Sequence, residues 1–352
     1  MRTLLLAAIA LAGCGSAPTS SQTTRPCPPR ASTADLPGAG GDLEEVASFG
    51  ENPGALKMFV HVPARTSAGA VVVALHGCTQ SARAYVAAGW NEVADRAGFV
   101  VVYPEQSSAN NLNRCFNWFE PGDTAREAGE ARSIASMTEH AKSTYGASRA
   151  FVTGLSAGAA MTAVMLATYP DLFEAGAIMA GIPYACASSM NDAFSCMSPG
   201  KDRDPTAWSA LLPNATASSP PRVSIWHGAA DWTVRPSNMT QLVRQWSAVN
   251  AVSEEPTTTT TEGRATHAEH RDASGVTRVE SWSIEGMGHG VALAPRDGCG
   301  KAGAFMVDAG VCSTTRAATF FGLIDGADAT ATEPPPRGGA PAAGTGEVDC
   351  VP

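Results

Sequence analysis

A serine, an aspartate and a histidine stand in this sequence at positions where they could act together. Ser156 is the centre of Gly154-Leu155-Ser156-Ala157-Gly158, which follows a short β-rich run and precedes an Ala-rich, helix-favouring run. A Gly-x-Ser-x-Gly segment between a strand and a helix is typical of a nucleophile elbow, a sharp turn that exposes the serine hydroxyl. Such a turn leaves no room for Cβ atoms at its glycines. The alternative is an ordinary serine in a Gly-rich turn.

A serine hydroxyl is a poor nucleophile at neutral pH and needs an adjacent base, itself oriented by a carboxylate. On an elbow of this kind the partners follow in the order serine, acid, histidine, each on a loop after a strand. Asp231 comes just after the predicted strand 223–226, and His289 lies between two glycines after the predicted strand 276–284. We therefore predict a catalytic triad of Ser156, Asp231 and His289.

Other residues of the right types compete for two of these roles. The alternative acids, in Pro- and Ser-rich surroundings, are Asp192, Asp202 and Asp204. The alternative histidines are His227, which precedes the acid, and His267 and His270, which lie in a polar stretch. Asp231 itself could instead cap the following helix.

Acyl transfer also requires two backbone N–H groups aimed at the developing oxyanion. The N–H of Ala157 is the first expected donor. The second should come from the loop 76–80 after the predicted strand 70–75, and we choose the N–H of Cys78, with Thr79 as the alternative. In the structural alternative, His76 and Gly77 only close the strand.

Aromatic side chains near these motifs are candidates for the wall of a substrate pocket, although most aromatic residues belong to the core. These candidates are Phe116, Trp118, Phe119 and Trp232. The segment between Cys186 and Cys196 is either a cap that shapes the pocket or a stapled surface loop.

Strand-like and helix-like patterns alternate along the chain. The apolar, β-branched runs 70–75 and 99–103 are typical of strands buried on both faces. Residues 82–97 and 125–145 have the spacing of amphipathic helices. We expect an α/β fold with a mostly parallel central sheet flanked by helices, in a single domain at residues 39–326.

The N-terminus has the features of an export signal. Arg2 and the apolar run 4–12 fit a signal peptide, and that run is too short to span a bilayer. The residues Leu-Ala-Gly before Cys14 resemble a bacterial lipobox, in which the cysteine becomes lipidated. We predict a lipoprotein signal peptide at residues 1–13 and membrane anchoring through Cys14, with an ordinary secretory peptide as the alternative. Both place the protein outside the cytoplasm.

Two further segments are low in complexity. Residues 14–38 are rich in Ser, Thr, Pro and Ala and are predicted to be a flexible tether. Residues 327–352 are predicted to be a Pro/Gly/Ala-rich tail.

Nine cysteines occur, and setting Cys14 aside leaves an even number, which in an oxidising compartment indicates disulfides. Eight cysteines allow 105 pairings, so the sequence alone does not determine them. Local spacing favours Cys186–Cys196 and Cys299–Cys312, and Cys78–Cys115 and Cys27–Cys350 remain by elimination. No Cys-x-x-Cys occurs, and no zinc site is expected.

Composition limits the possible partners. The chain has 352 residues, of which 44% are hydrophobic and 16% charged, enough for a sizeable core. Its net charge of −9 and the lack of any basic run argue against a nucleic-acid partner. The predicted chemistry requires no metal or organic cofactor, and we expect none.

Four motifs together resemble the polyhydroxybutyrate-depolymerase-type esterases, a group that includes feruloyl and acetylxylan esterases and lipoprotein members. The motifs are His76-Gly77-Cys78-Thr79-Gln80, Arg114-Cys115-Phe116-Asn117-Trp118-Phe119, Gly154-Leu155-Ser156-Ala157-Gly158-Ala159-Ala160-Met161 and Gly181-Ile182-Pro183-Tyr184. The resemblance covers roughly residues 45–325. It implies an α/β-hydrolase fold, a serine esterase triad at the three predicted residues, and a Cys78–Cys115 bond that braces the oxyanion loop.

We therefore expect a secreted or lipid-anchored serine esterase that works through an acyl-enzyme. Its candidate substrates are hydroxyalkanoate oligo- or polyesters and feruloyl or acetyl esters of plant polysaccharide. Dedicated polymer depolymerases usually append a linker and a polymer-binding domain, whereas only the predicted tail follows here, which argues against attack on solid polymer. The alternatives are a serine peptidase on the same fold and a non-catalytic, ligand-binding surface lipoprotein.

Overall fold

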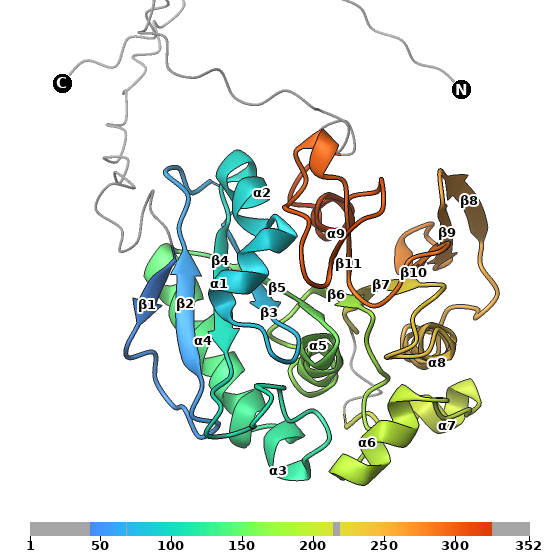
Figure 1. Ribbon diagram of the computed structural model, residues 1–352, viewed down its shortest axis with the longest axis horizontal. Coiled ribbons are helices and arrows are strands. Elements are labelled where there is room, and N and C mark those ends of the chain that lie inside the picture. Colours follow the sequence, from blue (N-terminus) through green and yellow to red (C-terminus); the bar gives the residue numbers. More distant parts are fainter. Residues whose placement is uncertain (1–42, 68, 214–218, 326–352) are drawn as a thin grey trace, which may run out of the picture. The chain divides into compact units, whose positions relative to one another are not determined.

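A computed structural model of the chain describes residues 43–67, 69–213 and 219–325, which all lie in one compact unit (Figure 1). The centre of this unit is a ten-stranded sheet in the order β1-β2-β4-β3-β5-β6-β7-β10-β9-β8. Its strands are β1 (Glu44–Val46), β2 (Lys57–His61), β3 (Ala70–Leu75), β4 (Val100–Glu105), β5 (Arg149–Leu155), β6 (Ala175–Met179), β7 (Arg222–Gly228), β8 (Thr258–Glu262), β9 (Ala265–Arg271) and β10 (Thr277–Ile284).

The six central strands, from β4 to β10 in the sheet order, run parallel to one another. Antiparallel strands extend both ends, with β2 and β1 beyond β4 and with β9 and β8 beyond β10. Every residue of β3 and of β6 is buried, as is typical of parallel strands that have helices on both faces. The predicted α/β fold with a mostly parallel sheet is confirmed.

Helices cover both faces of the sheet (Figure 1). One face carries α4 (Gly129–Tyr145), α5 (Ala157–Thr168) and α8 (Ser237–Val249). The other carries α1 (Ala82–Tyr85), η2 (Val86–Ala88), α2 (Trp90–Ala97) and α9 (Ser313–Phe321). The remaining elements are α3 (Pro121–Thr124), α6 (Met190–Met197), α7 (Pro205–Ser209), η3 (Pro295–Asp297) and the parallel strand pair β11 (Val291–Leu293) and β12 (Met306–Asp308).

Two helices that the sequence predicts as continuous are interrupted or begin late. The pattern 82–97 is broken at Gly89, whose φ is 91° and where a Cβ would lie 2.9 Å from the backbone nitrogen of Gly300. The pattern 125–145 becomes helical only at Gly129, whose φ of 47° lies in the left-handed region. Both breaks occur at glycines that adopt a positive φ.

Within the described residues there are three disulfides: Cys78–Cys115, Cys186–Cys196 and Cys299–Cys312. These three predicted pairs are confirmed. The fourth predicted pair, Cys27–Cys350, lies outside the described residues. Disulfides of this number fit an oxidising compartment.

Several other predictions also fall outside the described residues. They concern the signal peptide, the lipidation of Cys14, the tether, the tail and the domain boundaries. Within the described residues, no helix combines the length and the apolar character needed to cross a membrane.

Candidate active site

Strand β5 and helix α5 are joined by a single residue, Ser156. Its φ of 56° and ψ of −116° are unusual for a residue with a side chain, and such strain persists only where the surrounding structure enforces it. A Cβ on Gly158 would lie 2.5 Å from the carbonyl oxygen of His76, and one on Gly154 would lie 2.9 Å from the nitrogen of Ala159. The two glycines of the motif therefore allow the start of α5 to pack directly against the backbone around it.

Asp231 follows β7, and its side chain is buried. Its Oδ1 accepts hydrogen bonds from the backbone N–H groups of Thr233 (2.8 Å) and Val234 (3.0 Å), and its Oδ2 accepts one from Nδ1 of His289 (2.7 Å). Burial by itself would raise the pKa of Asp231, but the hydrogen bond and charge interaction with His289 hold this pKa below its usual value. The ionised carboxylate keeps a proton on Nδ1 of His289 and leaves Nε2 able to accept one.

The loop 76–80, called the oxyanion loop below, follows β3. Three of its backbone N–H groups have acceptors within the protein: that of Gly77 donates to Oε1 of Gln80 (2.9 Å), that of Gln80 to the carbonyl of Gly77 (3.2 Å), and that of Thr79 to the carbonyl of Asn113 (2.6 Å). For the N–H of Cys78, no acceptor is found in the described part of the chain. The N–H of Cys78 is therefore available to a bound oxyanion, whereas that of Thr79 is already engaged.

The buried side chain of His76 connects the oxyanion loop to the neighbouring loop through two hydrogen bonds. Its fully buried ring donates from Nδ1 to the carbonyl of Gly77 (2.8 Å) and accepts at Nε2 from the backbone N–H of Gln106 (3.1 Å). Burial lowers the pKa of His76 to about 4, so the ring is neutral at physiological pH. The neutral form is the one that this hydrogen-bond pattern requires.

The same network continues to a buried carboxyl group. The side-chain amide of Gln106 donates to the carbonyl of Cys115 (3.2 Å) and to Oε1 of Glu130, at the start of α4. Oε2 of Glu130 accepts from the backbone N–H of Asn117 (2.8 Å). Burial raises the pKa of Glu130 to about 8. The network ties the oxyanion loop to the wall formed by residues 106–117.

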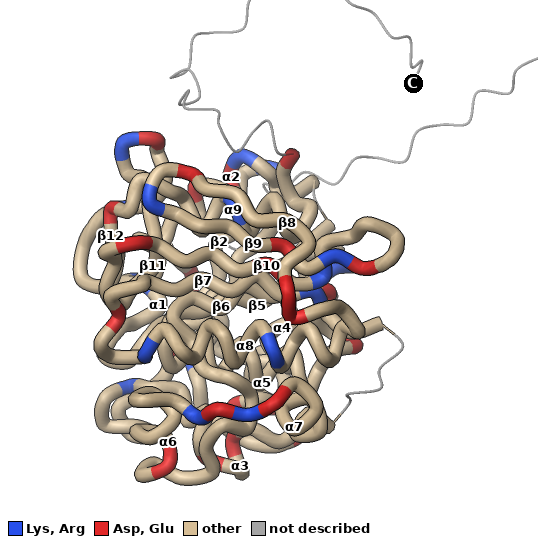
Figure 2. Tube along the Cα trace, turned by 90° about the vertical axis from the view of Figure 1, so that its right-hand side faces the viewer, with Lys and Arg blue, Asp and Glu red and all other residues tan. Residues whose placement is uncertain are grey.

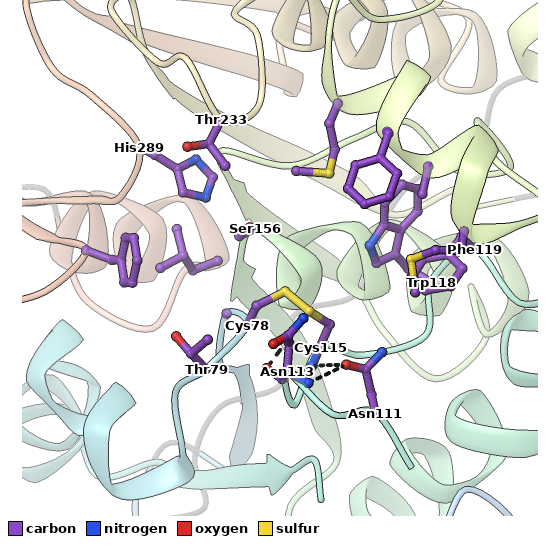
Figure 3. A pocket seen from close by; sticks show the side chains of 17 residues that line it. Cys78, Thr79, Asn111, Asn113, Cys115, Trp118, Phe119, Ser156, Thr233 and His289 are labelled. Carbon is purple, nitrogen blue, oxygen red and sulfur yellow. Dashed lines mark hydrogen bonds between the residues drawn. A yellow bond between two sulfur atoms is a disulfide. The ribbon is translucent and has the colours of Figure 1, made fainter. Parts of the chain in front are cut away.

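These elements surround a pocket of about 420 Å³ (Figure 3). Its lining contains both Ser156 and His289, and Asp231 is bound to the Nδ1 side of the histidine. No Lys, Arg, Asp or Glu lines it. The lining residues are Gly77, Cys78, Thr79, Asn111, Asn113, Cys115, Trp118, Phe119, Leu155, Ser156, Met190, Ala193, Phe194, Met197, Thr233, His289 and Phe305.

Comparison with known proteins identifies the family. The family model described as "Esterase PHB depolymerase" matches residues 57–270, more than half of the chain. The chain belongs to this esterase family. It is a carboxylic ester hydrolase with an α/β-hydrolase fold.

The alignments with known relatives span most of the length of this esterase. Poly(3-hydroxyalkanoate) depolymerase C of Paucimonas lemoignei is 48% identical over 291 residues, which make up 80% of this chain and 70% of the relative. Feruloyl esterase B of Talaromyces stipitatus is 34% identical over 262 residues, 70% of this chain and 72% of the relative. Among solved structures, an acetyl xylan esterase from Aspergillus awamori matches 71% of this chain and 94% of its own with a TM-score of 0.64 and 29% identity.

Helix α6 of the esterase forms one side of the pocket. Met190, Ala193, Phe194 and Met197 all line it, and their spacing of three, four and seven residues places them on one face of a helix. The segment between Cys186 and Cys196 is thus a cap over the pocket and not merely a stapled loop.

Covalent and ionic links hold this cap in place. The Cys186–Cys196 bond ties the end of α6 to the chain before it. Nζ of Lys201 contacts Oδ1 of Asp192 (2.6 Å) and donates to the carbonyl of Cys186 (2.7 Å). Lys201 opens a segment between α6 and α7 in which basic and acidic residues alternate (Figure 2). These links fix the position of α6, whose apolar face lines the pocket.

The aromatic candidates of the sequence separate into three groups. Trp118 and Phe119 line the pocket as predicted. Phe116 is buried and does not line the pocket, with its ring centroid 5.0 Å from that of His76. The placement of Trp232 at the pocket wall is corrected: its side chain is 77% exposed and stacks with the guanidinium of Arg235, 4.0 Å from its ring centroid. The carboxylate of Asp231 is buried, whereas the indole of Trp232 is exposed to solvent.

None of the alternative acids and histidines lines the pocket. His227 comes nearest to the site, with Nε2 3.5 Å from Oδ2 of Asp231, but this nitrogen donates to the carbonyl of Val234 (2.8 Å). The others have partners elsewhere: Asp192 with Lys201, Asp202 with Arg244, Asp204 with the N–H of Ala207, His267 with Glu280 and His270 with the carbonyl of Ser253.

Sequence reasoning missed several lining residues, namely Asn111, Asn113, Met190, Phe194, Met197, Thr233 and Phe305. A signal for the α6 group was present, because its apolar residues have helical spacing within an otherwise polar segment. The lining residues in loops carry no such periodicity.

One group in the described part of the esterase has the geometry to hold a metal ion. The ligand atoms of His267, Glu269 and Glu280 lie within 4.8 Å of one another. Glu269 already accepts from Arg271 (2.8 Å), and Glu280 accepts from the hydroxyl of Ser224 (2.6 Å) and contacts His267 (2.9 Å). These side chains already have partners within the protein, and none of the three residues lines the pocket.

Proposed function

We propose that the protein is a serine esterase that works through an acyl-enzyme, with Ser156 as nucleophile, His289 as base and Asp231 as the orienting carboxylate. The observation that carries this proposal is the 2.7 Å hydrogen bond that Nδ1 of His289 donates to Oδ2 of Asp231, in a histidine that lines the same pocket as Ser156. The bond leaves Nε2 of His289 as the proton acceptor.

The reaction proceeds in two halves. Nε2 of His289 takes the proton of the Ser156 hydroxyl while Oγ forms a bond to the ester carbonyl carbon, and the backbone N–H groups of Cys78 and Ala157 stabilise the oxyanion. The carbon–oxygen bond to the alcohol breaks, and the imidazolium protonates the departing alkoxide. A water molecule, deprotonated by His289, then attacks the acyl-enzyme and releases the acid and free Ser156.

The pocket lining favours a neutral, apolar acyl group. No Lys, Arg, Asp or Glu lines the pocket, and its apolar walls come from four segments: residues 118–119, Leu155, α6 and Phe305. We propose hydroxyalkanoate esters as the preferred substrates, with feruloyl and acetyl esters of plant polysaccharide as the second candidates. The 48% identity to a protein named poly(3-hydroxyalkanoate) depolymerase C supports this order.

Export and lipid anchoring through Cys14 are also part of the proposal. Supporting observations are the signal-like residues 1–13 and the three disulfides. Replacing Cys14 with serine should move the protein from the membrane fraction to the soluble fraction of the producing cell. Retention in the membrane fraction would contradict the anchor.

The test of the enzymatic proposal is ester hydrolysis by the protein without residues 1–14, beside its Ser156→Ala variant. The substrates are a soluble 3-hydroxybutyrate oligomer, methyl ferulate, acetylated xylan and a short aryl ester. We expect turnover that is highest for the hydroxybutyrate oligomer and that falls by about 10⁴-fold or more in Ser156→Ala.

Two controls distinguish the alternatives. A fluorophosphonate probe should label the parent protein and not Ser156→Ala, and absence of labelling in the folded parent would favour a non-catalytic binding protein. Cleavage of an amide without cleavage of the matched ester would favour a peptidase.

A further inference from the structure

The loop that carries His289 has little to hold it from within. In the run from Gly286 to Gly290, glycine alternates with Met287 and His289, so both chain neighbours of His289 are glycines. Glycine restricts the backbone less than any other residue, and it has no side chain that could limit the motion of the imidazole. Among the described residues, the ring forms one hydrogen bond, from Nδ1 to Asp231. Contacts from other segments must therefore fix the position of this base.

Phe305 contacts this loop in two ways. Its ring lies against the imidazole of His289, with 6.1 Å between the ring centroids and an interplanar angle of 80°. Edge-to-face contacts at this separation are favourable between aromatic rings. The backbone carbonyl of Phe305 accepts a hydrogen bond from the N–H of Val291 (2.9 Å), and a Cβ on Gly290 would lie 2.6 Å from the same carbonyl oxygen. The glycine at position 290 thus allows Phe305 to approach His289 this closely.

The backbone of Phe305 has a conformation that an aromatic residue rarely adopts. Its φ is 62°, in the left-handed region. Phe305 is the second of the two central residues of a turn, which Gly303 and Met306 close with two mutual backbone hydrogen bonds of 3.0 Å. A turn position with positive φ is usually filled by glycine or asparagine, and strained residues cluster at functional sites. The turn itself therefore does not call for a phenylalanine.

Packing into the core does not account for this side chain either. Phe305 is 42% exposed, whereas Met306 beside it is buried. Because apolar stabilisation grows with the area removed from water, a partly exposed ring contributes less to the fold than a buried one. Phe305 instead lines the pocket together with Ser156 and His289. Its contact with the base is the feature that explains a phenyl ring at this position.

We propose that Phe305 is a positioning residue, whose ring keeps the imidazole of His289 oriented so that Nδ1 donates to Asp231 while Nε2 accepts the proton of Ser156. This inference rests on the proposed esterase function and adds a residue to its machinery. Asp231 fixes one edge of the imidazole by a hydrogen bond, and Phe305 limits the rotation of the ring about that bond. Catalytic groups must be held within about 0.5 Å of productive geometry, so loss of this contact slows both halves of the reaction.

The test compares Phe305→Gly with Phe305→Tyr and Ala304→Gly. Phe305→Gly removes the ring and relieves the strain of the positive φ, whereas Phe305→Tyr keeps the ring. Ala304→Gly adds a glycine to the same turn at an exposed residue that does not line the pocket. The measurements are kcat and KM on a soluble aryl ester, urea unfolding, and the rate at which the Nδ1 proton of His289 exchanges with solvent, followed by NMR.

For Phe305→Gly we expect kcat to fall about tenfold and KM to stay within about twofold of the parent value, because the base loses its alignment. The free energy of unfolding should stay the same or rise, and the Nδ1 proton should exchange several times faster. Phe305→Tyr and Ala304→Gly should each keep roughly half or more of the parent kcat. Loss of activity without loss of stability separates a positioning residue from a structural one.

Other results would overturn the inference. A higher KM with kcat retained in Phe305→Gly would make Phe305 a part of the substrate wall. A lower free energy of unfolding that accompanies the loss of kcat would make it a structural residue. Unchanged kcat and unchanged proton exchange would leave it without a role at the site. Failure of the parent to turn over the ester would contradict the esterase proposal alone, since proton exchange at His289 tests the ring contact without any substrate.

Discussion

The backbone of Gly228 lies directly against the carbonyl group of Met287. A Cβ at position 228 would stand 2.8 Å from the Met287 carbonyl carbon, closer than such atoms approach in proteins. The same carbonyl accepts a hydrogen bond from the backbone N–H of Ala230 (2.9 Å). This contact joins the loop that carries Asp231 to the loop that carries His289, so the alignment of these two side chains depends on a glycine.

Gly228→Ala should therefore impair both activity and stability. The added methyl group forces the two loops apart, and a displacement of about 1 Å at a catalytic group can cost roughly 100-fold in rate. Overpacking of this kind also lowers the free energy of unfolding by about 1–3 kcal/mol. The checks are kcat/KM on a soluble ester and urea unfolding. Gly122→Ala is the matched control, because a Cβ there meets no atom within 4 Å; equal effects in both variants would contradict the prediction.

Asp231→Asn should remove most activity and leave the fold intact. The Asn oxygen can still accept the N–H groups of Thr233 and Val234, but its NH₂ group then faces Nδ1 of His289. Nδ1 becomes the acceptor and Nε2 keeps the proton, so the ring no longer accepts a proton from Ser156. We expect kcat to fall by about 10⁴-fold, as for the equivalent change in other triads. Retention of more than a tenth of the activity would show that another group orients the histidine.

The Cys78–Cys115 bond should matter for catalysis as well as for stability. It spans 37 residues, and the chain-entropy model assigns about 3–4 kcal/mol to a loop of this size. In Cys78→Ser/Cys115→Ser we also expect kcat to fall by up to about 100-fold, because the oxyanion donor loses its covalent brace. Cys299→Ser/Cys312→Ser, whose cysteines do not line the pocket, should lose a similar free energy with a smaller change in kcat. The opposite ranking of the two kcat values would count against the brace.

Glu130 should make stability fall as the pH rises. Its pKa in the folded state is about 8, against 4.5 for an ordinary glutamate, so between these values the folded protein holds a proton that the unfolded chain releases. This contribution is fully present below pH 4.5 and is lost as the pH rises through 8, by at most about 5 kcal/mol. Glu130→Gln does not titrate, so the difference in unfolding free energy between parent and variant should shrink from pH 5 to pH 8.

Denaturant unfolding at three pH values measures this difference. The exposed Glu120→Gln serves as the control for the loss of one negative charge. A parent–variant difference that stays constant from pH 5 to pH 8 would mean that Glu130 is ionised throughout that range.

Some parts of the candidate site could be predicted from sequence because short motifs, whose residues are adjacent in the chain, indicate them. One turn requires the glycines at 154 and 158, so the Gly-x-Ser-x-Gly motif by itself indicates that turn. The order of Ser156, Asp231 and His289 follows from strands that end at the same edge of a parallel sheet. The buried strand 70–75 was predicted with its observed bounds because a short, unbroken run of apolar, mostly β-branched residues is typical of a strand buried on both faces.

Other features depend on residues far apart in the chain. The helix break at Gly89 reflects the close approach of Gly300, more than two hundred positions away. The orientation of Trp232 could not be read from its position beside Asp231, because its indole packs with Arg235 and not into the pocket.

The amino-acid sequence by itself determined the fold class, the family and the chemical types gathered at the sheet edge, since each of these is encoded in short motifs and in their order. Only the tertiary structure decided that the N–H of Thr79 is engaged while that of Cys78 has no acceptor among the described residues, because the carbonyl that accepts from Thr79 belongs to Asn113 in a different loop. The position of α6 at the pocket was decided at the same level. The lining residues come from separate segments, and only packing brings such segments to one opening.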